Sequence, residues 1–202
     1  MAKKRIYTVY HRRKRSGKTN YRKRIALLKS NKTRFVVRKS NRNLVVQFID
    51  FYTKGDKVLV TLNSSKLEEY GWKLSKKNIP AAYLLGLLAS KKSPVKEAVL
   101  DIGLHTPTKG AKIFAVLKGA ADGGLNIHYT EGKFSDEERI SGAHIGKWLE
   151  ESKSNKKEGI FSTYIKEKIT DKSINDLFIK TRERIIKDEK EKSRGRTTTK
   201  GK

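Results

Sequence analysis

The chain contains no cysteine, and its first acidic residue is Asp50. The absence of cysteine excludes disulfide scaffolds, zinc sites built on thiolates and thiol nucleophiles. Long apolar runs are absent too, since the most apolar stretch, residues 79–89, is far too short to span a bilayer. The basic residues at the start are not followed by the apolar segment that a secretory signal needs. We therefore expect a soluble, intracellular protein.

Positive charge is what the sequence has in excess. Its 48 Lys and Arg against 21 Asp and Glu leave a net charge of +27, and residues 1–49 hold 17 of the basic residues without one acidic residue. Such a charge repels itself in the folded state unless a polyanion neutralises it. A merely solubilising run of charge would interleave acids with bases. The unbroken basic start therefore predicts a nucleic-acid partner, whose phosphates release counterions when Lys and Arg replace them.

The pattern of apolar residues predicts four parts: a basic RNA-binding arm with a short helix (1–30), a mixed α/β core (31–150), a helical C-terminal extension (151–192) and a disordered basic tail (193–202). Residues 11–18 have almost nothing apolar to bury, so we expect them to lack structure alone and to become ordered on a partner. In the short helix, Tyr21, Ile25 and Leu28 fall at helical spacing. A linker is expected at 152–159, before a last amphipathic helix that starts at Ser173.

The core alternates strand and helix patterns. Runs rich in β-branched and aromatic residues predict five strands, at 34–38, 44–51, 57–62, 97–102 and 125–129. Apolar residues at helical spacing predict one helix after Asn78 and another from Lys109. A capping box predicts the start of a further helix at Ser135. The predicted fold class is α/β, with a mixed five-stranded sheet flanked by helices. Along the chain, the sheet begins as an antiparallel meander and continues as βαβαβ.

Motifs that suggest chemistry have simpler explanations. The Ser-Gly-Lys-Thr run at 16–19 resembles the end of a nucleotide-binding loop, but position 12 is Arg where that loop needs Gly. Carboxylates at 136–138 suit the first turn of a helix. The four histidines include no pair at the i, i+4 spacing of a helical metal site. We predict no catalytic residue, metal or cofactor, and we expect Trp72 in the core rather than stacked on a base.

Several motifs together resemble one known family. They are Arg12-Arg13-Lys14-Arg15, Thr19-Asn20-Tyr21-Arg22-Lys23-Arg24, Leu27-Leu28-Lys29-Ser30, Val37-Arg38-Lys39-Ser40-Asn41, Glu69-Tyr70-Gly71-Trp72, residues 82–89 and 97–104, Lys109-Gly110-Ala111-Lys112 and Ser141-Gly142-Ala143-His144-Ile145. In this order, over about three quarters of the chain, they resemble the universal large-subunit ribosomal protein family numbered eighteen, in its archaeal form. The likeness thins beyond Trp148.

The resemblance implies a function and a site. That family binds 5S rRNA and anchors it to the large-subunit rRNA in the central protuberance, in the cytoplasm and beside other ribosomal proteins, without membrane or small-molecule substrate. Its core is similar to a ribonuclease-H-like sheet. Carried over by position, the RNA-binding residues are Arg12, Arg13, Lys14, Arg15, Lys18, Tyr21, Arg22, Arg24, Arg38, Lys39, Asn41 and Arg42. Lys and Arg would neutralise phosphates, and Tyr10 or Tyr21 would stack on an unpaired base.

Two other functions are weighed against this one. A nuclease on a ribonuclease-H-like sheet needs several carboxylates around divalent metal, and the strand regions offer only Asp50, Asp101 and, in a turn, Asp56. A general nucleic-acid-binding or compacting protein needs only charge, and it predicts no preference for folded RNA over duplex DNA.

Overall fold

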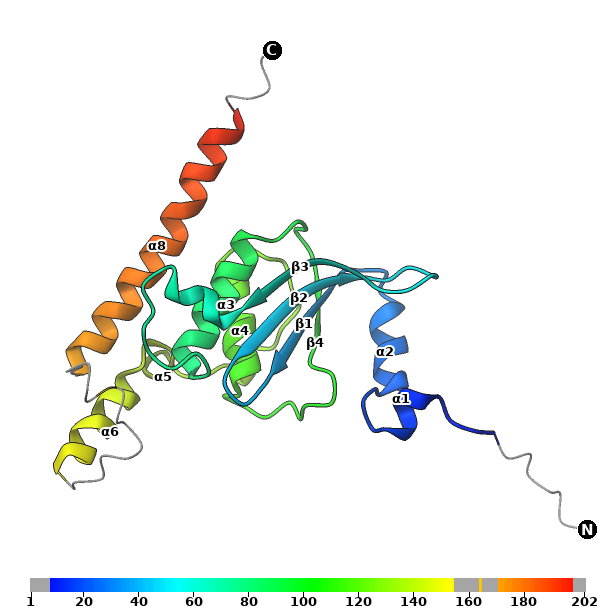
Figure 1. Ribbon diagram of the computed structural model, residues 1–202, viewed down its shortest axis with the longest axis horizontal. Coiled ribbons are helices and arrows are strands. Elements are labelled where there is room, and N and C mark those ends of the chain that lie inside the picture. The colour runs from blue at the N-terminus through cyan, green and yellow to red at the C-terminus, as the bar shows by residue number, and fades with distance from the viewer. Residues whose placement is uncertain (1–7, 155–163, 165–170, 198–202) are drawn as a thin grey trace, which may run out of the picture.

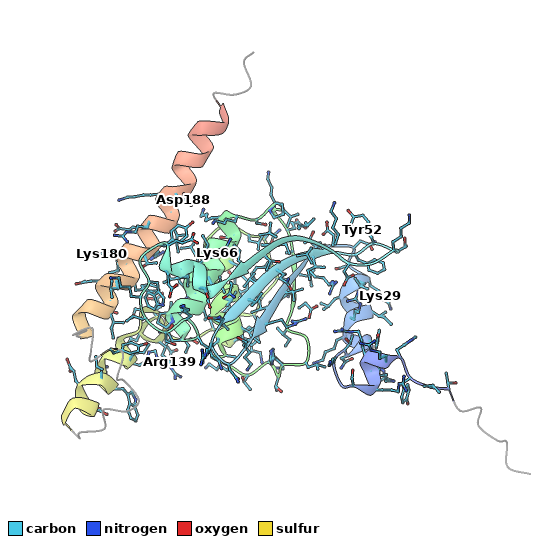
Figure 2. All side chains as sticks on the ribbon, in the orientation of Figure 1. Lys29, Tyr52, Lys66, Arg139, Lys180 and Asp188 are labelled. Atoms are coloured by element: carbon cyan, nitrogen blue, oxygen red, sulfur yellow. The ribbon has the colours of Figure 1, made fainter. Side chains whose placement is uncertain are left out.

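The computed structural model describes residues 8–154, 164 and 171–197. Figure 1 shows a twisted sheet at the centre, with the N-terminal helices α1 (Arg12–Arg15) and α2 (Tyr21–Leu28) on one side of it and the long helix α8 (Asp171–Thr197) on the other. Figure 2 shows the same separation by side chains, with Lys29 beside α2 and Lys180 and Asp188 on α8. Within the described ranges, no helix has both the length and the apolar character of a membrane span.

The sheet has four strands: β1 (Arg34–Lys39), β2 (Leu44–Asp50), β3 (Lys57–Asn63) and β4 (Val99–Asp101). Their spatial order is β3-β2-β1-β4. The first three pair antiparallel, which confirms the predicted meander, and β4 runs parallel to β1. The mixed α/β class is therefore confirmed. Phe35 faces Phe48 across the β1–β2 pair, and their ring centroids lie 5.2 Å apart in the core.

The predicted fifth strand at 125–129 is wrong. This segment makes one isolated parallel bridge, in which Glu97 pairs with Asn126. Its alternating apolar residues are buried as expected, since Leu125 and Ile127 are each 4% exposed. Burial alone does not make a strand, because a strand needs successive backbone pairs along a ladder. The alternation thus predicted which side chains are buried but not how the backbone pairs.

Two helices, α3 (Ile79–Lys91) and α4 (Lys112–Asp122), form the other half of the core. The Asn78 side chain caps α3 by accepting from the N–H of Ala81, at 2.9 Å, and the proline next to it suits a first helical turn. The two helices approach closely at glycines: a Cβ on Gly86 would collide with the backbone carbonyl of Val116. Backbone contact of this kind requires residues without a side chain.

The helix predicted from Ser135 through Trp148 is two helices, α5 (Glu137–Ser141) and α6 (Ala143–Ser154). Gly142 separates them with a left-handed φ of 95°. The predicted capping box does not form: the N-cap of α5 is Asp136, without a side-chain cap hydrogen bond, and the Ser135 hydroxyl donates to the backbone carbonyl of Gly110 at 3.1 Å. Of the expected linker, residues 152–154 end α6, and 155–159 lie outside the described residues. Two short 3-10 helices, η1 (Ser64–Glu68) and η2 (Glu131–Lys133), complete the core.

Helix α8 packs against the core through its N-terminal half. Ile174, Phe178 and Ile185 are buried, and the Tyr70 hydroxyl donates to the Asp188 carboxylate at 2.8 Å. The helix continues to Thr197, so residues 193–197, expected in a disordered tail, are helical, and 198–202 lie outside the described residues. The division of the chain into four parts stays a prediction. Trp72 is fully buried, with its indole N–H donating to the Ser75 carbonyl, which confirms its place in the core.

Candidate nucleic-acid interface

The arm has more local structure than its composition predicts. The stretch 12–15 forms a helical turn, although every one of its residues is exposed. Arg13 Nε donates to the Thr19 hydroxyl at 2.8 Å, which ties the turn to the residues that follow it. The Asn20 side chain then caps α2 by accepting from the N–H of Lys23. These hydrogen bonds give the arm a defined local conformation, and its ordering on a partner stays a prediction.

Alternation along β1 places two arginines on one face of the sheet. Phe35 and Val37 point into the core with α3 and α4, so Arg34 and Arg38 point to the opposite face. Asp101 on β4 pairs with Val36, which stands between the two arginines. Its carboxylate accepts from Arg34 Nη1 at 3.1 Å and from Arg38 Nη2 at 3.2 Å. The register of a parallel pair thus sets one carboxylate between two guanidinium groups.

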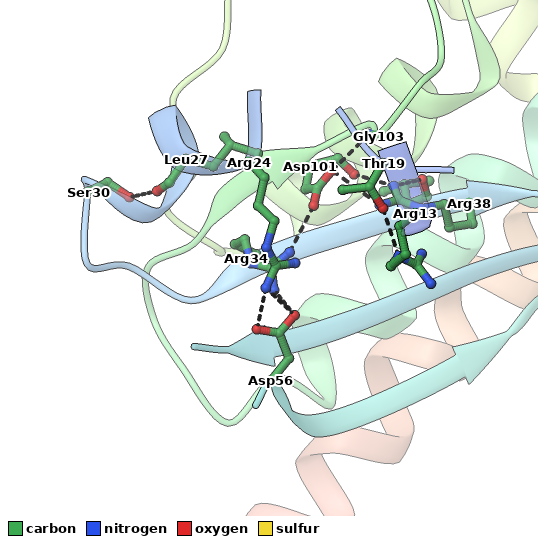
Figure 3. Close-up of polar contacts among 11 residues, drawn as sticks. Arg13, Thr19, Arg24, Leu27, Ser30, Arg34, Arg38, Asp56, Asp101 and Gly103 are labelled. Carbon is green, nitrogen blue, oxygen red and sulfur yellow. Dashed lines mark hydrogen bonds and ion pairs between the residues drawn. The ribbon is translucent and has the colours of Figure 1, made fainter. Parts of the chain in front are cut away.

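A second carboxylate extends this set to the arm. Asp56, in the turn before β3, accepts from Arg34 Nη2 at 2.7 Å. Both of its carboxylate oxygens also accept from Arg24 Nη2, on α2, at 2.7 Å and 2.8 Å. We call these five residues, Arg24, Asp56, Arg34, Asp101 and Arg38, the Arg–Asp cluster (Figure 3). It joins the arm to β1, to the β2–β3 turn and to β4, so it holds α2 at the sheet.

Burial makes this cluster energetically important. Arg34 is 3% exposed and Asp101 is 7% exposed, and a charge in such a position is tolerated only when it is paired. Burial by itself would raise the pKa of Asp56, but hydrogen bonds from Arg24 and Arg34, together with their charges, outweigh it and lower the pKa. Asp56 is therefore ionised at neutral pH. Three cations and two anions leave the cluster with an excess positive charge.

A hollow of about 790 Å³ lies between the arm and the core. The arm lines it with basic residues, among them Arg13 and Lys18, and the core lines it with the Arg–Asp cluster and with apolar residues of the loop after β4, including Leu104 and Pro107. Basic groups beside apolar walls suit the phosphates and bases of a nucleic acid. The hollow therefore has the chemical character expected of a nucleic-acid interface.

The structure gathers some predicted RNA-binding residues and separates others. Arg13, Lys18, Tyr21, Arg24 and Arg38 line the hollow. The remaining ones, outside it, are Arg12, Lys14, Arg15 and Arg22 on the arm and Lys39, Asn41 and Arg42 at the β1–β2 turn, all exposed. Tyr21 is half-buried with its ring 5.3 Å from that of His11, whereas Tyr10 is 61% exposed and carries Lys14 Nζ 3.5 Å from its ring centroid. Tyr10 is thus the more accessible ring for stacking.

Sequence reasoning missed the inner members of the cluster. Arg34 is the first residue of the predicted strand, and its position at the edge of an apolar run does not indicate that its side chain is buried in an ion pair. Asp56 and Asp101 were weighed only as metal ligands. Both instead bind arginine, and Asp50 accepts from the Thr33 hydroxyl at 2.5 Å. Among the described residues, no three His, Asp or Glu side chains gather in a way that could hold a metal ion.

Comparison with known proteins identifies the family. The family model described as ribosomal large subunit proteins 60S L5 and 50S L18 matches residues 4–97 and 91–130. The large ribosomal subunit protein uL18 of Korarchaeum cryptofilum (strain OPF8) is 45% identical over 189 residues, which cover 92% of this chain and 97% of the relative. The chain belongs to this family. The resemblance drawn from the motifs is thereby confirmed.

Membership in the uL18 family sets the broad role of the chain. It is a structural constituent of the large ribosomal subunit, an rRNA-binding protein of the cytoplasmic translation machinery. The matched residues include the arm, the whole Arg–Asp cluster and the loop that leads into α4. The cluster and the hollow therefore lie in the part of the chain that carries the family likeness.

Proposed function

We propose that this chain binds 5S rRNA and attaches it to the large-subunit rRNA in the central protuberance, as a structural protein without catalytic activity or cofactor. The observation that carries the proposal is the Arg–Asp cluster, which holds a helix-containing basic arm beside a hollow in a chain of the uL18 family. A loose basic tail would serve for any polyanion. An arm held at a fixed angle suits one folded RNA.

Within this function, we assign the phosphate contacts chiefly to the exposed cations. Arg12, Arg13, Lys14, Arg15 and Lys18 are all exposed, and within the described residues none of them is paired with a carboxylate. Each can replace a counterion on a phosphate. Sequence readout by base edges is secondary, because an RNA helix hides them in a deep, narrow major groove.

Arg24 and Arg38 have a different part in this proposal. Both bind carboxylates of the cluster, so each orients the arm or the hollow first and contributes its remaining N–H groups to RNA second. An arm that is already oriented loses less conformational entropy when it binds. The cluster therefore raises affinity chiefly by orienting the arm, and direct contacts of Arg24 and Arg38 with RNA come second.

Further partners follow from the same assignment. We propose that large-subunit rRNA and neighbouring ribosomal proteins contact surfaces other than the arm. Helix α8 lies on the side of the sheet away from the arm, which gives the chain two separate sides for two partners (Figure 1). The ribonuclease-H-like relationship of the sheet stays a prediction.

A competition experiment tests the proposed function. Labelled 5S rRNA bound to the full chain at moderate salt is competed with unlabelled 5S rRNA, transfer RNA and duplex DNA. We expect 5S rRNA to compete at far lower concentration than the other two. Equal competition by all three would contradict the proposal and favour a general nucleic-acid-binding protein, for which charge alone drives association.

A further inference from the structure

Three lysines outside the arm gather at the other end of β1. Lys39 is the last residue of β1, Lys112 is the first residue of α4, and Lys77 precedes α3. Lys77 Nζ donates to the backbone carbonyl of Asn41, at 3.1 Å, which brings it to the β1–β2 turn next to Lys39. We call Lys39, Lys77 and Lys112 the lysine cluster. Its members come from three segments that are far apart in the sequence.

The start of the loop that leads into α4 is fixed against β1. Arg38 Nη1 donates to the backbone carbonyl of Asp101 at 2.8 Å, and Gly103 lies so close to the Arg38 guanidinium that a Cβ there would be 2.9 Å from its Cζ. The same loop lines the hollow through Leu104 and Pro107. One loop, residues 102–111, therefore lines the hollow near its start and leads to Lys112 at its end.

The charges of Lys39 and Lys77 act on Lys112, which agrees with a position of the three lysines near one another. Burial, followed by the positive charges of Lys77 and Lys39, lowers the pKa of Lys112. Burial, followed by the charges of Lys39 and Arg38, also lowers the pKa of His105 nearby. The folded protein therefore bears a repulsion here that an anion would relieve.

No carboxylate in the described part of the chain relieves it. None of the three lysines forms an ion pair there, whereas other core lysines do: Lys76 Nζ lies 2.6 Å from a Glu68 oxygen, and Lys32 Nζ lies 2.8 Å from a Glu97 oxygen. The first turn of α4 contains no acidic residue, and its N-cap, Ala111, offers no side-chain acceptor. The positive end of the helix dipole thus adds to the lysine charges.

We propose that the lysine cluster is a second RNA-contacting surface, which binds phosphates of the same rRNA as the arm. This inference rests on the proposed function and extends it to Lys77 and Lys112, on the core. RNA fits better than an acidic protein because the cluster adjoins the exposed Asn41 and Arg42 of the β1–β2 turn and shares a loop with the hollow. One RNA backbone can therefore pass from the arm along this loop to α4.

Salt dependence of 5S rRNA binding tests the proposal. The double variant Lys77→Gln, Lys112→Gln is compared with the full wild-type chain, and the slope of log affinity against log salt is measured for each. Loss of two phosphate contacts reduces the magnitude of that slope by about 1.4–1.8. The ratio of wild-type affinity to variant affinity is then about tenfold larger at 50 mM than at 200 mM salt. Thermal unfolding by circular dichroism verifies that the variant is folded.

The chain offers a matched control next to the cluster. Lys76 is half-buried like Lys77 but is paired with Glu68, so Lys76→Gln removes the same charge and leaves the slope unchanged. The variant Lys77→Arg, Lys112→Arg keeps both positive charges, so it keeps the wild-type slope. If Lys112→Gln impairs folding, Lys77→Gln alone reduces the slope by about 0.7–0.9.

The outcomes separate this inference from the proposed function. Wild-type preference for 5S rRNA together with an unchanged slope in the folded glutamine variants would overturn the second surface and leave the function standing. No preference of the wild type for 5S rRNA would overturn the function itself. Combination with Arg13→Ala and Arg15→Ala gives reductions in slope that add, because the arm and the lysine cluster release separate counterions.

Discussion

Arg34 and Asp101 lie 67 positions apart in the chain and form a buried ion pair, with Arg34 Nη1 3.1 Å from the carboxylate. The other terminal nitrogen of this guanidinium, Nη2, donates a hydrogen bond to Asp56, which also accepts from Arg24 of the arm. The direction of α2 relative to the sheet therefore depends on one buried arginine. The orientation of the arm and the stability of the core are therefore coupled through it.

Replacement of Arg34 should destabilise the fold strongly. Arg34→Met keeps much of the side-chain volume but leaves the carboxylates of Asp56 and Asp101 with fewer cations, and removing one partner of a buried pair costs on the order of 3 kcal/mol. Urea unfolding of the two chains measures the difference. Arg42→Met, at an exposed turn position, serves as the control and should change stability by less than about 0.5 kcal/mol. Equal stability of all three chains would mean that the cluster contributes nothing to the fold.

Asp56 should make the stability sensitive to acid. Its pKa in the folded protein is below the ordinary value of 3.8, so the unfolded chain takes up its proton first as the pH falls. The contribution of Asp56 is therefore complete above the unfolded pKa and is lost as the pH falls through the folded pKa. Asp56→Asn should be less stable by about 1–3 kcal/mol at pH 7, and the gap should close below pH 4. Urea midpoints from pH 7 to pH 3 check this; a gap independent of pH would contradict the assignment.

The same substitution should affect RNA binding in a distinct way. Asp56→Asn loosens the arm but removes no cation, so affinity for 5S rRNA should fall several-fold while the salt slope is kept. Faster hydrogen exchange at the backbone amides of α2 should accompany the loss. An affinity equal to that of wild type would show that a preoriented arm is not needed.

The glycines between α3 and α4 give a prediction about the core. Gly86→Ala would drive a methyl group into the backbone carbonyl of Val116, which cannot yield as a flexible side chain can. We expect a loss of stability of about 3 kcal/mol or more, measured by urea unfolding. Gly132, where a Cβ would meet no atom within 4 Å, provides the control Gly132→Ala, with an expected change below about 0.5 kcal/mol. A small effect at Gly86 would mean that the two helices can separate freely.

Local patterns predicted most of the fold. Turn residues and β-branched runs predicted the three-stranded meander, and Asn78 with Pro80 predicted the start of α3, because these signals act through neighbours in the sequence. Two predictions failed where distant residues intervened. Ser135 bonds to Gly110 rather than capping its own helix. The same reason explains the fifth strand, whose existence required a ladder with distant residues that the chain does not form.

The candidate site shows the same division. Composition predicted the basic arm as the nucleic-acid-binding part, and both this assignment and that of individual RNA contacts stay predictions. The Arg–Asp cluster was beyond reach because its pairs span 67 and 32 positions, and only the β1–β4 register puts Asp101 between Arg34 and Arg38. The sequence selects Lys39 as an RNA-binding residue but not Lys77 or Lys112, because only the fold brings these two near it. The charge of the sequence predicts a nucleic-acid partner, and the fold determines which surfaces that partner can contact.

The most direct test of RNA binding through the arm is the salt dependence of 5S rRNA binding by wild type and by the variant Arg13→Ala, Arg15→Ala. Both side chains are exposed, so the variant should fold as wild type does, which thermal unfolding verifies. Loss of two phosphate contacts should weaken binding and reduce the slope of log affinity against log salt by about 1.4–1.8. Affinity and slope equal to those of wild type would contradict the assignment of the arm to RNA.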